Sequence, residues 1–127
     1  MQQVNPDREI TMNTSNHDLK TKHCKPCEGG VPPLDRQEID HLLKDLAGWI
    51  LVGNELVKAF DFSNYYETMA FVNATAWVSH QEDHHPDLEV GYRQCRVRYS
   101  THAIGGLSEN DFICAAKIDA LQTSQGA

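Results

Sequence analysis

Three histidines and an aspartate stand close together in the second half of the chain. His84 and His85 are adjacent, His102 follows them after a predicted pair of strands, and Asp111 lies shortly beyond. An imidazole has an ordinary pKa near ~6.5, so it can give or take a proton around neutral pH. Several imidazoles around one pocket would suit hydration, dehydration or tautomerisation. No serine or cysteine forms a recognisable nucleophile motif with a histidine, so covalent catalysis is less favoured.

Each of these residues also has a structural interpretation. Asp111 could complete a capping box with Ser108, and His102 could be an ordinary turn residue. His80, His84 and His102 could bind a metal, because the first two have helical ligand spacing, but no ExxH motif or second pair supports this. Spacing alone therefore gives only weak support for a His/Asp pocket, and it names no substrate.

The elements that would position these side chains begin with a helix and a hairpin. Asp35 and Glu38 have capping-box spacing, and apolar residues at helical spacing follow them. Gly48 is expected to close this helix. Two apolar runs around Gly53 and Asn54 then predict a β-hairpin.

A second, longer helix is expected to begin with Ser63 as its N-cap. The stripe expected to face the core consists of Tyr66, Met69, Ala70, Ala74 and Trp77. The helix should end near His84, because Pro86 moves His85 out of the α region. His80 and His84 are four residues apart, so they would share a face if the helix continues that far.

Two strands, roughly 88–92 and 94–101, and a last helix complete the predicted fold. In the second strand, Cys95, Val97 and Tyr99 alternate with polar residues. Ser108 is the expected N-cap of that helix, and Asp111 occupies its third position. The order α-β-β-α-β-β-α predicts an α+β two-layer sandwich, with a four-stranded antiparallel sheet and helices on one face. Because such a sheet has two free edges, we expect strand-to-strand or helix-to-helix oligomerisation.

Composition restricts the class of protein. A chain of 127 residues fits one domain. The formal charge of −7, from 11 basic and 18 acidic residues, argues against binding to nucleic acid or to an anionic membrane. No apolar run approaches the ~20 residues of a membrane span. We therefore expect a cytoplasmic protein whose four cysteines are reduced.

The polar start of the chain predicts a tail and a linker before the domain. Residues 1–22 are expected to be disordered, and Met12 could be an alternative start. Residues 23–33 read as a linker, residues 34–122 as a single α+β domain, and residues 123–127 as a C-terminal tail.

The linker contains a CxxC motif, "HCKPC", at Cys24 and Cys27. Such a pair can bind zinc or perform redox chemistry. A structural zinc site would need a second, similarly spaced pair, which Cys95 and Cys114 do not make. A thioredoxin-like pair would follow a strand and open a helix. The favoured interpretation is a pair of reduced thiols near a mobile end.

The stretch "HHPDLEVGYRQCRVRYSTHAIGGLSENDFICAAKID" resembles the signature of the pterin-4a-carbinolamine dehydratases. That signature combines HHP, a tyrosine, a strand ending in THxxGGL(S/T)xxD, and a helix ending in ID. The resemblance covers about residues 24–121, because "GW" at Gly48 and "AFVN" at residues 70–73 also match. The "HCKPC" lead-in is similar to the N-terminal segment of many bacterial members.

The resemblance implies a reaction, the loss of water from 4a-hydroxytetrahydrobiopterin to give a quinonoid dihydropterin. It implies catalytic roles for His84, His85, His102 and Asp111, and substrate contacts for His80, Asp83 and Pro86. It implies no metal and no organic cofactor, because the pterin is the substrate. It also implies a functional link to an aromatic amino acid hydroxylase, and assembly as a homodimer or homotetramer.

One position departs from the family pattern. His80 stands where many animal members carry a glutamate, which could alter affinity or substrate. Animal relatives can also act as dimerisation partners of a transcription factor, so a non-catalytic dimerisation or assembly role is the alternative. The complete set of His84, His85 and His102 favours the enzyme.

Overall fold

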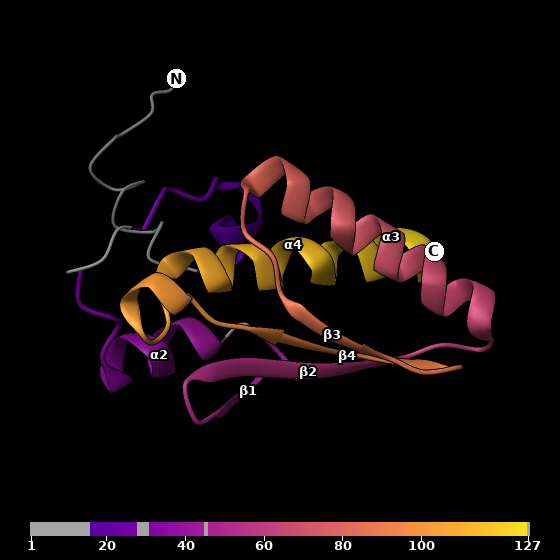
Figure 1. Ribbon diagram of the computed structural model, residues 1–127, viewed down its shortest axis with the longest axis horizontal. Helices are drawn as coiled ribbons and strands as arrows, with labels where there is room; N and C mark the ends of the chain where they lie inside the picture. The colour runs from indigo at the N-terminus through magenta and orange to yellow at the C-terminus, as the bar shows by residue number, and fades with distance from the viewer. Residues whose placement is uncertain (1–15, 28–30, 45, 127) are drawn as a thin grey trace, which may run out of the picture.

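The computed structural model describes residues 16–27, 31–44 and 46–126. The elements, with η1 and η2 as 3-10 helices, are η1 (Asn16–Thr21), α2 (Arg36–Leu43), β1 (Ile50–Val52), β2 (Glu55–Asp61), α3 (Tyr65–Glu82), β3 (Asp87–Val90), β4 (Gln94–Tyr99), η2 (His102–Ile104) and α4 (Glu109–Gly126). The four strands form one antiparallel sheet in the order β1-β2-β4-β3. Helices α3 and α4 lie over one face of this sheet (Figure 1). The predicted α+β sandwich and its element order are confirmed.

Strand β4 is central, and its alternation separates core from surface. Cys95, Val97 and Tyr99 point into the core and are fully buried. The residues between them face outward, where Arg98 lies 3.2 Å from Glu89 across the β3–β4 pair. This is the pattern that the sequence predicted for the second strand of the pair.

The first helix begins where the capping signal predicts and ends earlier than expected. The Glu38 backbone N–H donates to Asp35 Oδ1 and the Asp35 N–H donates to Glu38 Oε1, both at 2.8 Å. Helix α2 ends at Leu43, so the expectation that Gly48 closes it was wrong. Gly48 instead has a positive φ of 88° in the turn that leads into β1. The hairpin expected at Gly53 is confirmed.

Helix α3 buries a different face from the one predicted. Tyr66 and Trp77 are 82% and 59% exposed, so the expected stripe faces outward. The buried side chains of α3 are Thr68, Phe71, Thr75, Val78 and Glu82. Phe71 stacks against Phe60 and Phe62, with ring centroids 4.6 and 5.2 Å apart. This aromatic contact with the sheet side fixes which face of the helix is buried.

Polar residues in the buried stripe explain why periodicity pointed to the other face. Thr68 is fully buried, but its hydroxyl lies 2.9 Å from both the Asn64 and the Tyr92 carbonyl oxygens. Hydrogen bonding of this kind removes most of the cost of burying a hydroxyl. Asn64 is also the N-cap, since its Oδ1 accepts from the Glu67 N–H, so the N-cap expected at Ser63 was one residue early.

The expected tails are partly ordered in the structure. Residues 1–15 lie outside the described residues, but residues 16–21 form η1, and Leu19 is only 2% exposed. Burial of that one leucine against the core holds η1 next to α4. Helix α4 continues to Gly126, through residues expected to form the C-terminal tail. Among the described residues, no helix has the length and apolar character needed to cross a membrane.

Candidate active site

A pocket of about 570 Å³ opens where the end of α3, the η2 turn and the start of α4 meet. His84 and His85 reach it from the link between α3 and β3, and His102 reaches it from η2. The other lining residues are Cys24, Lys25, Pro26, Cys27, Gln81, Glu82, Asp83, Ser100, Thr101, Ala103 and Asn110. Two sequence segments, the link after α3 and the η2 turn, therefore bring the three predicted histidines to one cavity.

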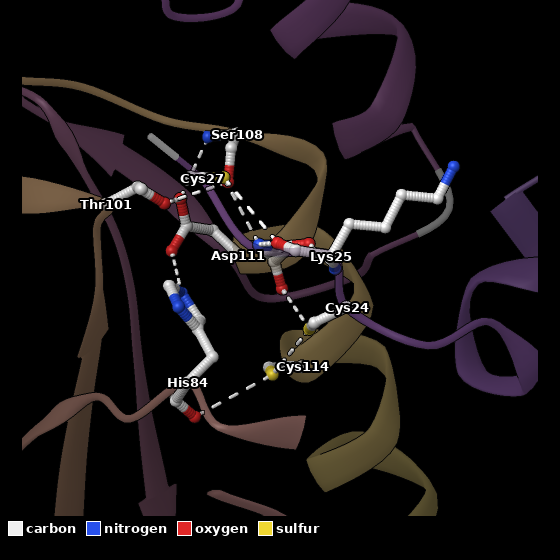
Figure 2. A network of polar contacts seen from close by, with 9 residues as sticks. Cys24, Lys25, Cys27, His84, Thr101, Ser108, Asp111 and Cys114 are labelled. Atoms are coloured by element: carbon white, nitrogen blue, oxygen red, sulfur yellow. Dashed lines mark hydrogen bonds and ion pairs between the residues drawn. The ribbon is translucent and has the colours of Figure 1, made fainter. Parts of the chain in front are cut away.

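His84 is bound to the buried carboxylate of Asp111. The His84 Nε2 to Asp111 Oδ1 distance is 2.6 Å, and the two side chains are 13% and 0% exposed (Figure 2). An ionised carboxylate only accepts hydrogen bonds, so Nε2 carries the hydrogen of this contact. Nδ1 is then the ring nitrogen that can exchange a proton with a ligand in the pocket.

The surroundings of His84 favour its protonated form. Burial by itself would lower the pKa of His84, because it disfavours the imidazolium charge. The hydrogen bond to Asp111 and the charge of that carboxylate outweigh burial, and the pKa of His84 is raised above its ordinary value. A histidine with a raised pKa stays an acid at higher pH than a free imidazole does.

Asp111 caps the start of α4 and also binds a histidine of the pocket. Its Oδ2 accepts from Thr101 Oγ1 at 2.7 Å and from the Ser108 backbone N–H at 3.0 Å. The second bond is the carboxylate half of a capping box at the start of α4. The two interpretations left open by the sequence, a helix cap and a partner of the site, therefore both hold. The cap fixes the carboxylate so that Oδ1 points at His84.

The backbone at the end of α3 turns the HHP segment into the pocket. Asp83 is in the left-handed region, with φ of 54°, and the His84 N–H donates to the Ser79 carbonyl at 3.2 Å. The left-handed conformation of Asp83 ends α3 at Glu82, two residues before His84, in agreement with the helix end expected near His84. The His84 ring stacks on Tyr99 of β4, with centroids 5.9 Å apart and an interplanar angle of 7°.

The other predicted site residues lie in contrasting positions. His85, His102 and Asp83 line the pocket and are exposed to solvent. His80 lies on the outward face of α3, where it stacks on Trp77 at 5.4 Å, and it is not among the lining residues. Pro86 is also outside the lining, so the substrate contacts expected of Pro86 and His80 remain predictions.

In the described part of the chain, no cluster of three His, Cys, Asp or Glu side chains is arranged to hold a metal ion.

The CxxC segment is part of the pocket, which its sequence pattern did not indicate. Cys24 packs against the core, and its Sγ lies 3.6 Å from Sγ of Cys114 on α4. Cys24 and Cys27 are free thiols, as expected, but the expected setting near a mobile end was wrong, because Cys24 is held against the core. The segment is held by long-range hydrogen bonds to Glu82 and Asn110, which local sequence patterns do not reveal.

A family model described as pterin 4 alpha carbinolamine dehydratase matches residues 32–121. The chain belongs to the pterin-4a-carbinolamine dehydratase family. The residues that carried the resemblance in the sequence are the ones that supply the pocket histidines and Asp111.

Relatives in this dehydratase family span nearly the same length. A protein of Nitrosospira multiformis is 64% identical over 110 residues, which cover 87% of this chain and 97% of the relative. A protein of Nitrosomonas eutropha is 68% identical over 108 residues, which cover 84% and 96%. The names of both relatives assign pterin-4-alpha-carbinolamine dehydratase activity provisionally.

A solved structure has a similar fold. The crystal structure of a transcriptional coactivator/pterin dehydratase from Brucella melitensis aligns with a TM-score of 0.68 at 27% identity. The alignment covers 70% of this chain and 97% of that chain. The dehydratase family is thus matched by sequence over the whole predicted domain, and by structure over most of it.

Proposed function

We propose that this protein catalyses the dehydration of 4a-hydroxytetrahydrobiopterin to quinonoid dihydropterin and water. The observation that carries the proposal is the His84–Asp111 pair, 2.6 Å apart, in a pocket that also contains His85 and His102. Family membership supplies the substrate class, and the pocket supplies groups suited to the proton transfers of this reaction.

The reaction needs one proton delivered and one removed. Cleavage of the C4a–O bond requires protonation of the departing hydroxyl, while the electron pair at N5 forms the C4a–N5 double bond and the N5 proton leaves. His84 is suited to protonate the hydroxyl, because its raised pKa keeps it in the acid form. His102 is then the base that accepts the N5 proton, and His85 positions the ring. General acid and base catalysis of this kind typically contributes about 10²–10⁴ in rate.

Asp111 acts through His84 in this proposal. It is buried, so it orients the imidazole and stabilises its charged form. The other histidines of the pocket are exposed and can adjust to the bound heterocycle. No metal and no organic cofactor takes part in the proposed reaction, since the pterin is itself the substrate.

A stopped-flow assay tests the function. The 4a-carbinolamine is generated in situ, and its decay is followed with and without protein. We expect the wild-type protein to accelerate the decay in proportion to its concentration. Decay at the uncatalysed rate over all protein concentrations would contradict the proposal. The same assay, coupled to an aromatic amino acid hydroxylase, tests whether the dehydratase recycles the pterin that such an enzyme releases.

The outward face of α3 supports a second proposal, that the protein forms homodimers or homotetramers. Tyr66 and Trp77 are large apolar side chains with most of their surface exposed. Exposed aromatic residues on one helix face are typical of contact surfaces between proteins. A Trp77→Lys variant should shift the mass measured by light scattering toward the monomer. A non-catalytic assembly role would instead be supported by partners that still bind after all three pocket histidines are replaced.

A further inference from the structure

The lead-in at residues 23–27, which we call the docked segment, is attached to the pocket by two buried side chains. Glu82 accepts from the Cys24 backbone N–H at 2.8 Å and contacts His23 Nδ1 at 3.0 Å. The Glu82 side chain is only 4% exposed. A buried carboxylate requires such partners, because unpaired burial of its charge would be costly.

Asn110 makes the second attachment. Its Oδ1 accepts from the Lys25 N–H at 3.0 Å, and its Nδ2 donates to the Lys25 carbonyl at 2.6 Å. The same Nδ2 lies 3.3 Å from Cys27 Sγ. A side-chain amide that bonds to both the N–H and the carbonyl of one residue resembles the pairing between two β-strands, and it fixes the position of that backbone.

The side chains of the docked segment contribute unequally to the pocket. Figure 2 shows the Lys25 side chain extending away from His84. Cys24, Lys25, Pro26 and Cys27 all line the pocket together with His84. The proline ring and the two thiols are the apolar groups of this segment, and they suit contact with the flat face of a heterocycle.

The docked segment has no place in the proton transfers, yet it forms a wall of the cavity in which they occur. We propose that residues 24–27 of the docked segment are a substrate-binding element that contacts the ring system of the reduced pterin, with Glu82 and Asn110 as the positioning residues that hold it. This rests on the proposed function, and it adds a source of affinity separate from the histidines. Glu82 and Asn110 come from α3 and α4, so two independent elements fix the wall.

The proposal predicts a specific kinetic signature. Asn110→Ala removes the hydrogen bonds to Lys25 and Cys27, and we expect KM to rise about tenfold while kcat changes less than about threefold. Asn110→Asp keeps an acceptor for the Lys25 N–H and should raise KM less. Glu82→Leu should also raise KM, because it releases the segment from α3. A general disturbance of the neighbouring Asp111 would instead lower kcat.

Glu109→Gln is the matched control. Glu109 forms an ion pair with Lys22 at 2.8 Å, on an exposed surface next to the docked segment. Exposed ion pairs contribute little, so KM and kcat should stay within about twofold of wild type. Unchanged KM in both Asn110→Ala and Glu82→Leu would overturn the proposal.

A chemical measurement on the wild-type protein decides the question if a variant does not fold. Cys27 is partly exposed, so iodoacetamide should alkylate it, and saturating 7,8-dihydrobiopterin should slow this alkylation at least threefold. Tandem mass spectrometry locates the label, with the fully buried Cys95 and Cys114 as unreactive internal controls. Equal alkylation rates of Cys27 with and without the pterin would overturn the proposal. If the carbinolamine assay shows no catalysis but the pterin protects Cys27, the proposed reaction fails and the binding wall stands.

Discussion

His84 and His102 line the same pocket in contrasting surroundings. The His84 side chain is 13% exposed, bonded to Asp111 and stacked on Tyr99. His102 lies in η2 and is exposed to solvent. A group held in one orientation can deliver a proton along a fixed direction, whereas an exposed group can exchange protons with water. His84 is therefore preorganised for a single role, whereas the exposed His102 side chain can adjust its orientation to the ligand.

Removing the imidazoles one at a time tests this comparison with the largest expected effect. His84→Ala should lower kcat by about 10²–10⁴, because the fixed acid is lost. His102→Ala should lower kcat by about 10² or less, because water can reach the exposed position and accept the N5 proton. Stopped-flow decay of the carbinolamine measures both.

His41→Ala is a control for this experiment, because His41 is an exposed histidine on α2, outside the pocket. The kcat of the His41→Ala variant should match that of the wild-type protein. Equal losses in His84→Ala and His102→Ala would contradict the distinction between the two histidines, and undiminished turnover in either variant would remove that residue from the proton-transfer pair.

The fold was predictable from local signals where these agree with the tertiary contacts. The Asp35–Glu38 capping box, the Gly53 turn and the alternation along β4 each appear in the structure as expected. The pairing of Asp111 with Ser108 was predictable for the same reason, since a capping box is a relation between residues three apart.

The parts that could not be predicted depend on contacts between distant residues. Helix α3 has apolar side chains on both faces, and tertiary contacts such as those of Phe71 with Phe60 and Phe62 decide which face is buried. The docking of Cys24 likewise depends on Glu82, which is 58 positions away along the chain. No periodicity or motif encodes such a contact.

The buried partner of His84 supplies a second test, on stability. Asp111→Ala leaves the Ser108 N–H and the His84 ring without their acceptor, and it leaves the Thr101 hydroxyl with only the Ser108 hydroxyl as a partner. Breaking a buried charged pair in this way typically costs about 3–5 kcal/mol in the free energy of unfolding. Urea denaturation followed by circular dichroism measures the change. Asp40→Ala, at an exposed carboxylate paired with Arg36, should change it by less than about 1 kcal/mol.

A loss for Asp111→Ala no larger than that of the Asp40→Ala control would show that Asp111 is not a structural centre of the site. It would also weaken the contrast between the two histidines, because the fixed orientation of His84 depends on this carboxylate.

Removing one donor to Asp111 should have the smallest effect. Thr101→Val keeps the shape of the side chain but removes the hydroxyl that donates to Asp111 Oδ2 at 2.7 Å. A hydrogen bond to a charged group is worth about 1.5–3 kcal/mol, so the free energy of unfolding should fall by that amount. Because the His84–Asp111 bond remains, kcat should fall only severalfold. Gln37→Ala, which removes an exposed polar group from α2, is the control and should leave both quantities near wild type.

The dependence of kcat on pH in wild type and in Asp111→Asn tests the central claim most directly. The raised pKa of His84 means that the acid form persists above pH ~6.5, so wild-type kcat should fall only as pH rises through that raised value. Without the carboxylate charge, burial is the largest remaining influence on His84 and lowers its pKa, so the falling limb of Asp111→Asn should move to lower pH. Falling limbs at the same pH in both proteins would contradict the claim that Asp111 keeps His84 in its acid form.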